Sequence, residues 1–309
     1  MKITVIGAAG TLGSCSAFYI GVNKLADELV MIDPWEGMLK AHWMDLTNAL
    51  ASLDVSVIPG SYKDLAGSDI VVIASAAPAV VVKSRADLLP ANFAIVKENA
   101  ENIRKYCPDA ITIIETNPVD GLNYAMYLMS SKKDRRKNIG YCINDTVRFR
   151  RWSAEKLGVK VSRVQGIAIG EHGDNQVMLF STLTVDGKPV KIDAAIKSSL
   201  RGMPAKNLQE METVVPKRTH GWTSAIGTVD YIKAIKNNTR EVMPCNVLLQ
   251  GEYGYTNTTC GVPVVLGKNG IEEIKVLKLN ADEQEGLQKS ILAVRPQMQF
   301  VEAQLGIKN

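Results

Sequence analysis

The chain has 309 residues, of which 46% are hydrophobic and 22% are charged, a composition typical of a globular protein. That length exceeds what one small core needs, so we expect two domains, or one large α/β unit with an appendage. A net charge of +4 is far from the strongly basic character of nucleic-acid-binding proteins, so we expect no nucleic acid as a partner.

Five cysteines are scattered along the chain, and none forms a C-x-x-C pair. This arrangement indicates a reducing compartment and argues against a disulfide framework and against a metal site. The first apolar run is too short for a signal peptide, and no apolar segment has the length of a membrane span. We therefore expect a cytoplasmic protein without a membrane partner.

A β-branched run at residues 2–6 predicts a strand, and the segment GAAGTLG (residues 7–13) follows it, before a helical pattern. This G-x-x-G-x-x-G spacing is a variant of the dinucleotide-binding fingerprint. The first glycine would make the turn, the second would let a pyrophosphate approach the backbone, and the third would let the helix pack closely on the sheet. Amides at the helix start would face the phosphates. The candidate cofactor residues here are Gly7, Gly10, Thr11, Leu12 and Gly13.

A second expected strand, residues 29–32, ends at Asp33, roughly 20 residues beyond the glycines, where an acid can bind a ribose diol. A carboxylate in that place would repel a 2′-phosphate, so the sequence favours NAD over NADP. The alternative is that Asp33 only forms a turn or a cap before Pro34.

Strands and helices then alternate along the chain. Helices are expected at residues 37–50 and 92–106, and strands at 55–58, 70–74, 111–114 and 139–143. Alternation of this kind is typical of an α/β fold with a Rossmann-type doubly wound parallel sheet, in which the strand ends form the ligand-binding edge.

Two polar segments fall at that edge. Asn117, in TNPVD (residues 116–120), can offer a donor and an acceptor to a nicotinamide or a substrate hydroxyl, or it can cap the helix before Pro118. Asp145 and Arg148 stand one helical turn apart where the next helix opens. The alternative for this second pair is a surface ion pair.

The most unusual segment is GEHGD (residues 170–174), which follows an expected strand at 164–169. A histidine among glycines and carboxylates at a strand end is placed to meet a ligand. Its imidazole can take up and return a proton near neutral pH. A polar turn with an exposed His172 is the alternative.

After residue 174 the pattern changes to hairpins and helices, which predicts a mixed α+β substrate domain. We expect a hairpin from 179–185 to 188–190, helices at 192–200, 205–215, 223–236 and 281–305, and strands at 242–249, 261–266 and 271–277. We place the boundary at residue 145, which gives an NAD-binding domain of residues 1–144 and a substrate domain of residues 145–309.

Taken together, these motifs resemble the L-lactate/malate dehydrogenase family, nearly from end to end. The resemblance implies reversible, NAD-dependent hydride transfer between an L-2-hydroxy acid and its 2-oxo acid. It makes His172 the catalytic acid–base and Asp145 the carboxylate that orients it. It makes Arg148 the partner of the substrate carboxylate, and Asn117 a positioning residue for substrate and cofactor. It also implies a homodimer or homotetramer, to which the helices around Trp43 and Trp152 could contribute.

The mobile loop of that family would be residues 77–85 of this chain. Arg85 falls on the family's loop arginine, which polarises the reacting carbonyl, although a solvated charge at a helix start is the alternative. The rest of the loop departs from the family. At the position where malate enzymes of this family have an arginine that pairs with the second substrate carboxylate, this chain has Ala79, and three valines follow.

The departure at Ala79 leaves the substrate open. Lys83 could supply the missing charge and keep malate as a candidate, whereas lactate or a longer apolar 2-hydroxy acid would suit the valines. Thr223 looks like the opposite wall of the pocket and is neutral, and we interpret the neighbouring His220 as a surface residue at a helix start.

Two further hypotheses remain. NAD-dependent glycosidases share a similar dinucleotide half, but they need a metal site of cysteine and histidine, and no histidine accompanies Cys142. A non-catalytic NAD-binding protein is the other hypothesis. The presence of all the candidate catalytic residues argues against it.

Overall fold

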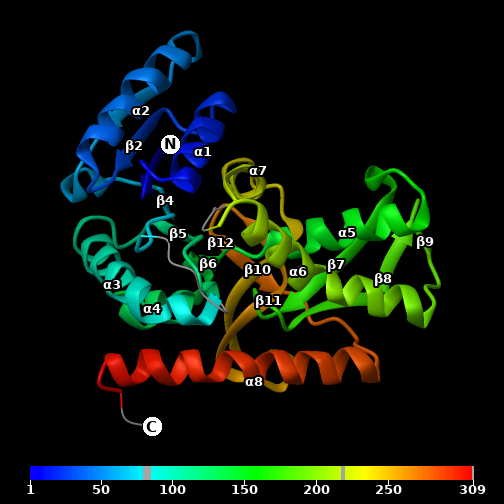
Figure 1. Ribbon diagram of the computed structural model, residues 1–309. Coiled ribbons are helices and arrows are strands. Elements are labelled where there is room, and N and C mark those ends of the chain that lie inside the picture. The colour runs from blue at the N-terminus through cyan, green and yellow to red at the C-terminus, as the bar shows by residue number, and fades with distance from the viewer. Residues whose placement is uncertain (79–84, 217–219, 308–309) are drawn as a thin grey trace.

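The N-terminal half of the chain is an α/β unit in which parallel strands alternate with helices (Figure 1). The computed structural model describes residues 1–78, 85–216 and 220–307, without the side chains of residues 85, 86 and 208. The elements of this half are β1 (Lys2–Ile6), α1 (Thr11–Val22), β2 (Glu28–Ile32), α2 (Glu36–Ala49), β3 (Ser56–Pro59), β4 (Ile70–Ile73), α3 (Leu89–Tyr106), β5 (Ile111–Ile114), α4 (Val119–Met129) and β6 (Asn138–Gly140).

These strands pair in the order β3-β2-β1-β4-β5-β6, and each pair is parallel. The order reverses between β1 and β4, which is the switch point where doubly wound sheets bind ligands, beyond the carboxyl ends of the strands. The predicted Rossmann-type sheet is therefore confirmed. All four residues of β4 are buried, as expected for a strand covered on both faces.

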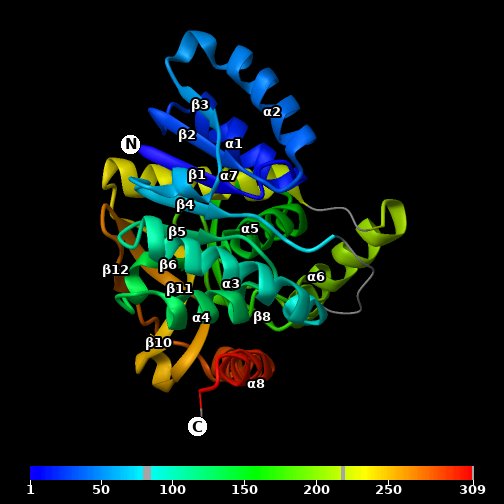
Figure 2. The same cartoon turned by 90° about the vertical axis from the view of Figure 1, so that its left-hand side faces the viewer.

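Two layers of helices cover this sheet, as Figure 2 shows. Consecutive residues of a strand point to opposite faces, so Val5 packs with α1, α2 and a later helix, whereas Ile6 packs with α3, α4 and the C-terminal helix. Burial of both faces explains why the strands are continuous apolar runs without a polar alternation.

The C-terminal half continues the sheet with antiparallel strands. Its elements are α5 (Ile143–Leu157), β7 (Val164–Gly170), β8 (Gln176–Val185), β9 (Lys188–Pro189), α6 (Ala194–Val214), α7 (Gly221–Asn237), β10 (Glu241–Gln250), β11 (Thr256–Gly267), β12 (Gly270–Ile274) and α8 (Ala281–Gln304). β10 pairs with β6 through Asn246 and Gly140, and the path continues through β11, β7, β8 and β9, with β12 on β11. The expected mixed second domain is confirmed.

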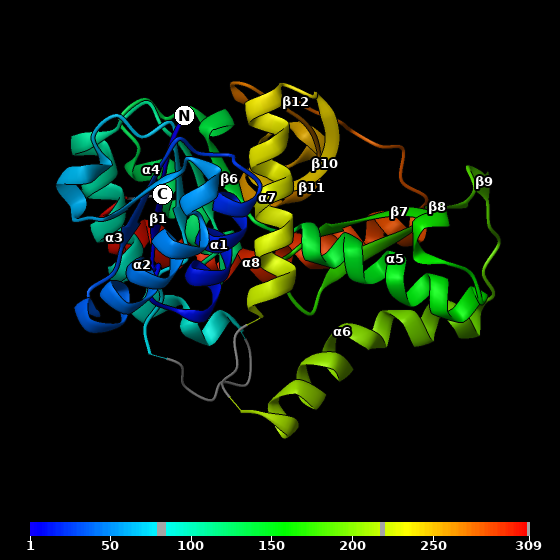
Figure 3. The same ribbon diagram turned by 90° about the horizontal axis from the view of Figure 1, so that it is seen from above.

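Three helices connect the two halves or stand apart from them. Seen from above, α7 lies between the N-terminal sheet and the strands of the second half, and α8 runs under both halves (Figures 1 and 3). In the same view, α6 lies away from the main body. No helix in the part of the chain that the structure describes has both the length and the apolar composition needed to cross a membrane.

The structure corrects several boundaries: β11 begins at Thr256 and not at 261, and β12 ends at Ile274 and not at 277. Residues 194–214 form one helix, not two, because Pro204 removes a single backbone donor without ending the helix. The strand expected at 139–143 ends at Gly140, since the amide of Asp145 already bonds the carbonyl of Cys142 and begins α5. This early start brings Asp145 into the first turn of the helix, at the ligand edge of the sheet.

Candidate active site

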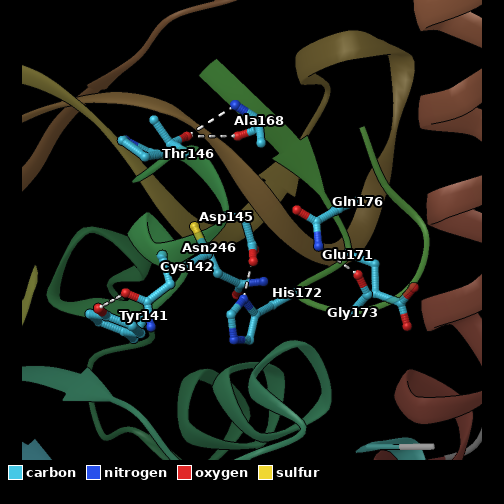
Figure 4. A network of polar contacts seen from close by, with 12 residues as sticks. Tyr141, Cys142, Asp145, Thr146, Ala168, Glu171, His172, Gly173, Gln176 and Asn246 are labelled. Carbon is cyan, nitrogen blue, oxygen red and sulfur yellow. Dashed lines mark hydrogen bonds and ion pairs between the residues drawn. The ribbon is translucent and has the colours of Figure 1, made fainter. Parts of the chain in front are cut away.

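A buried histidine–carboxylate pair lies at the carboxyl ends of the strands. β7 ends at Gly170 with φ +92°, and the following turn carries His172, which is 6% exposed. Its Nδ1 lies 2.7 Å from Oδ2 of Asp145 in the first turn of α5, and Figure 4 shows the two side chains pointing toward one another. A carboxylate in this place orients the imidazole and stabilises its protonated form. The alternative of an exposed polar turn is wrong.

The backbone of this histidine is held by a second buried carboxyl group. The amide of His172 donates to Oδ2 of Asp120 at 3.0 Å, and the side-chain amide of Asn246 donates to Oδ1 at 2.6 Å. Burial, together with the nearby Glu171, raises the pKa of Asp120 well above its usual range. Sequence reasoning missed both partners. Asp120 was visible only as part of the TNPVD segment, and Asn246 has no local signal.

Arg148 lies beside the pair. Its Nη1 is 3.7 Å from Oδ1 of Asp145, and the two side chains are 15% and 6% exposed. This burial rules out an ordinary surface ion pair. One carboxylate thus contacts both a proton-exchanging imidazole and a guanidinium, whose fork of donors can bind a carboxylate ligand through two hydrogen bonds.

The glycine loop has the geometry of a phosphate-binding turn. Gly7 has φ +90°, and a Cβ there would collide with the backbone of Ser75. A Cβ on Gly13 would collide with the carbonyl of Gly7, so the helix approaches the loop closely only with glycine. Gly10 is exposed and is the N-cap of α1, whose first residues are Thr11 and Leu12. The backbone amides at this positive end of the helix dipole can therefore bind an anion.

Two further residues complete a surface that fits a dinucleotide. Asp33 follows β2 and accepts a hydrogen bond from the amide of Ala9 in the glycine loop at 3.0 Å, so its carboxylate lies next to that loop. The side-chain oxygen of Asn117 is buried and has no hydrogen-bond partner among the described residues, although its backbone carbonyl accepts from Asn92 at 2.6 Å. An unsatisfied acceptor at the ligand edge suits a hydroxyl or amide donor of a bound cofactor or substrate.

The remaining candidates divide into those the structure describes and those it does not. Ala79 and Lys83 lie outside the described residues, and so does the side chain of Arg85, whose backbone begins the 3-10 helix Arg85–Leu88. Thr223 lies in the first turn of α7, where its carbonyl accepts from the hydroxyl of Tyr141 at 3.2 Å. This bond ties the start of α7 to the segment that leads into α5.

A cavity next to Arg148 gathers polar side chains from several elements. The polar and aromatic residues that line it are Arg148, Trp152, Asp174, Gln176, Asn207 and His220. His220 precedes a helix, as expected, and it is partly exposed, and it also lines this cavity. Trp152 was expected only in a helix that could contribute to a subunit contact, whereas its side chain is 1% exposed and belongs to an apolar cluster of the chain itself.

One buried acid beside the site has no partner of opposite charge among the contacts found in the described chain. Glu115 immediately precedes the TNPVD segment and accepts a hydrogen bond from the hydroxyl of Thr228 on α7. Burial raises its pKa to about 7. A change in its charge therefore falls in the physiological pH range.

In the part of the chain that the structure describes, no three histidine, cysteine, aspartate or glutamate side chains are grouped as ligands of a metal ion. Cys142 is buried, and burial raises the pKa of its thiol well above the usual range. A cysteine in that state is a poor metal ligand.

Comparisons with known proteins agree with this geometry over nearly the whole chain. Residues 1–140 match the family model described as lactate/malate dehydrogenase, NAD binding domain, and residues 144–304 match the alpha/beta C-terminal domain of the same family. Malate dehydrogenase of Natronomonas pharaonis is 37% identical over 290 residues, covering 92% of this chain and 94% of that protein. Malate dehydrogenase of Bacteroides fragilis is 35% identical over 307 residues, with 95% of each chain covered.

Solved structures give the same picture. Malate dehydrogenase of Cryptosporidium parvum superposes with a TM-score of 0.91 at 31% identity, covering 98% of this chain and 99% of that one. Lactate dehydrogenase of the same organism, solved with lactic acid and NAD, also gives a TM-score of 0.91, at 30% identity and with 97% and 98% covered. Structural likeness thus does not separate the two substrates.

Proposed function

This chain belongs to the lactate/malate dehydrogenase family, and we propose that it interconverts L-malate and oxaloacetate. Like its family, it is an oxidoreductase that interconverts a 2-hydroxy acid and a 2-oxo acid with NAD. The observation that carries the chemistry is the buried pair of His172 and Asp145, 2.7 Å apart, with Arg148 beside it. The names of the relatives and the polar cavity next to Arg148 support malate as the substrate.

The proton chemistry belongs to the buried pair. In the oxidation direction, Nε2 of His172 takes the proton from the substrate hydroxyl, and in the reverse direction it returns that proton to the carbonyl oxygen. Asp145, bonded to Nδ1, keeps the ring in the orientation that presents Nε2 and stabilises the imidazolium that forms. Bound NAD would accept the hydride that leaves the carbon atom bearing this hydroxyl.

The other candidates bind and orient the substrate. Arg148 holds the carboxylate next to the reacting carbon through paired hydrogen bonds, and the open side-chain oxygen of Asn117 positions the reacting groups. Arg85 polarises the carbonyl, and Thr223 forms one wall of the pocket. Ala79 and Lys83, in the segment that matches the family's specificity loop, would contribute to the choice of substrate.

The glycine loop would hold the cofactor. The amides of Thr11 and Leu12 would bind its pyrophosphate, since Gly7, Gly10 and Gly13 allow close approach, and Asp33 would bind the adenosine ribose. Residues 1–144 then serve mainly the cofactor, and residues 145–309 mainly the substrate.

We place the enzyme in the cytoplasm as a homodimer or homotetramer. Its five cysteines are all free thiols, which suits a reducing compartment. An apolar groove runs between α1, α2 and α7, with Phe18, Trp222 and Ile226 on its walls at 49%, 72% and 50% exposure. Exposed apolar surface of this kind favours a second subunit. Trp152 belongs to the chain's own core and takes no part in such a contact, whereas α2, which carries Trp43, borders the groove.

A panel of 2-oxo acids tests the substrate. NADH oxidation is followed with oxaloacetate, pyruvate and a branched apolar 2-oxo acid, and we expect the highest kcat/KM with oxaloacetate. A preference for pyruvate or for the branched acid would replace malate with an apolar substrate and make the valine-rich loop the specificity element. NADH binding without turnover of any 2-oxo acid would support a non-catalytic protein.

A further inference from the structure

The cavity next to Arg148 is built from four separate parts of the chain. Arg148 and Trp152 come from α5, Gln176 from the start of β8, Asn207 from α6, and His220 from the N-terminus of α7. Convergence of polar side chains from distant segments on one small space is typical of a binding site, since a packed core would fill that space with apolar groups.

Two buried polar atoms in this wall have no hydrogen-bond partner among the described residues. Trp152 is 1% exposed, and its indole Nε1 makes no hydrogen bond to any residue that the structure describes. The side-chain oxygen of Gln176 is likewise buried and unsatisfied. Native proteins seldom leave such atoms unpaired, because the desolvation of each one opposes folding. A polar group that enters the cavity would satisfy them.

The cavity also lies within reach of the reacting end of the substrate. Trp152 follows Arg148 by four residues on α5, which places both side chains on one face of the helix, one turn apart. A four-carbon acid bound to Arg148 by one carboxylate extends over only a few bonds to the other. Three ionisable side chains line the cavity. Arg148 is positively charged, His220 can become so, and Asp174 is an acid.

We infer that this cavity binds the second carboxylate of a dicarboxylic substrate, with His220 supplying positive charge and Trp152 an indole N–H donor. The inference rests on the proposed function and adds the residues that select its substrate. It explains how a chain with Ala79 in its loop can accept an acid with two carboxylates, because the charge comes from the start of α7. His220 and Trp152 are thus specificity residues, and neither touches the reacting carbon.

The test compares oxaloacetate with pyruvate in wild type, His220→Asn and His220→Lys. His220→Asn keeps a residue suited to a helix N-terminus but removes the charge, so we expect the KM for oxaloacetate to rise about 10- to 100-fold with little change in kcat. Pyruvate, which lacks the second carboxylate, should show unchanged kinetics. His220→Lys should retain most of the affinity for oxaloacetate.

A second pair of variants isolates the indole donor. Trp152→Phe keeps an aromatic ring in the core and removes only the N–H, and we expect a rise of about 3- to 10-fold in the KM for oxaloacetate alone. The matched control is Trp43→Phe, which removes an indole donor that bonds the carbonyl of Val57 far from the cavity. It should change neither KM.

The outcomes separate this inference from the proposed function. Suppose that wild type uses oxaloacetate, but that His220→Asn changes the kinetics equally with oxaloacetate and pyruvate, or changes neither. The inference is then overturned, and the proposed function stands. If wild type prefers pyruvate, both are overturned, and the cavity holds only water.

Discussion

At the scale of single residues, Asp145 is the group on which the site depends most. Its two oxygens face different partners, with Oδ2 at 2.7 Å from Nδ1 of His172 and Oδ1 at 3.7 Å from Nη1 of Arg148. The acid–base and the substrate-binding arginine are therefore positioned by the same side chain. A change at this carboxylate should affect proton transfer and carboxylate binding together.

Asp145→Asn tests that dependence. The amide keeps the shape of the side chain but removes the negative charge that stabilises the imidazolium, so kcat should fall about 10²- to 10⁴-fold. NADH binding, measured by fluorescence, should stay within a factor of about two, because the glycine loop and Asp33 are untouched. A kcat near that of wild type would show that His172 works without its carboxylate.

Glu115 gives a prediction about stability and pH. Burial raises its pKa from an ordinary value of 4.5 to about 7, so between these values the folded protein holds a proton that the unfolded chain has lost. Stability should therefore decrease as pH rises from about 4.5 to 7 and then level off, with a total effect of at most about 3 kcal/mol.

Glu115→Gln removes this titration while keeping an acceptor for the hydroxyl of Thr228. We expect its melting temperature to exceed that of wild type by a few degrees at pH 8 and the difference to vanish below about pH 4.5. Two melting curves that run parallel from pH 5 to pH 8 would rule out a raised pKa at Glu115.

At the scale of elements, the placement of α7 decides the shape of the substrate pocket. The side-chain amide of Asn144 on α5 donates to the hydroxyl of Ser224 at 3.0 Å, and the hydroxyl of Tyr141 bonds Asn144 at 2.7 Å. Gly227 allows the close approach of the two elements, because a Cβ there would collide with Tyr141 and Ile143.

Gly227→Ala should consequently push α7 away from α5. Overpacking at such a contact costs about 1–3 kcal/mol of the free energy of unfolding. His220 and Thr223 start the same helix, so the KM for the 2-oxo acid should rise more than the KM for NADH. Gly67, a turn glycine before β4, has open space around it but a positive φ. Gly67→Ala therefore gives a control of backbone strain without displacement of α7. Equal effects of both variants on KM would contradict the argument.

The same elements show how far the sequence predicts this molecule. Strand and helix periods predicted a doubly wound parallel sheet, because β1, β4 and β5 are mainly apolar runs bounded by glycine or polar turns. The pairing of Asp120 with Asn246 was out of reach, since 126 residues separate them and only the fold brings them together. Trp152 was expected near a subunit contact, but only the fold shows that it is buried in the chain's own core with an indole N–H that bonds no described residue.

At the scale of the whole molecule, one sheet path and the long helix α8 connect the two halves. α8 packs with α4 and shares an apolar cluster with α3, and it also bonds the second half, where the amide of Glu171 donates to the hydroxyl of Ser290 at 2.5 Å. The segment that carries His172 is thus supported from both halves. An apolar groove lies on the surface between α1, α2 and α7.

Ile226→Asp tests whether that groove is a subunit contact. Ile226 is 50% exposed on the groove wall, and an aspartate there would leave a charge unpaired against an apolar partner surface, which association cannot tolerate. Sedimentation velocity should show wild type as a dimer or tetramer and the variant as a smaller species. Val276→Asp makes a similar change at a residue that is 58% exposed outside the groove, and it should leave the assembly intact.

Because α7 carries both the groove wall and His220, dissociation should also raise the KM for the 2-oxo acid. A variant that stays fully assembled would move the subunit contact to another face.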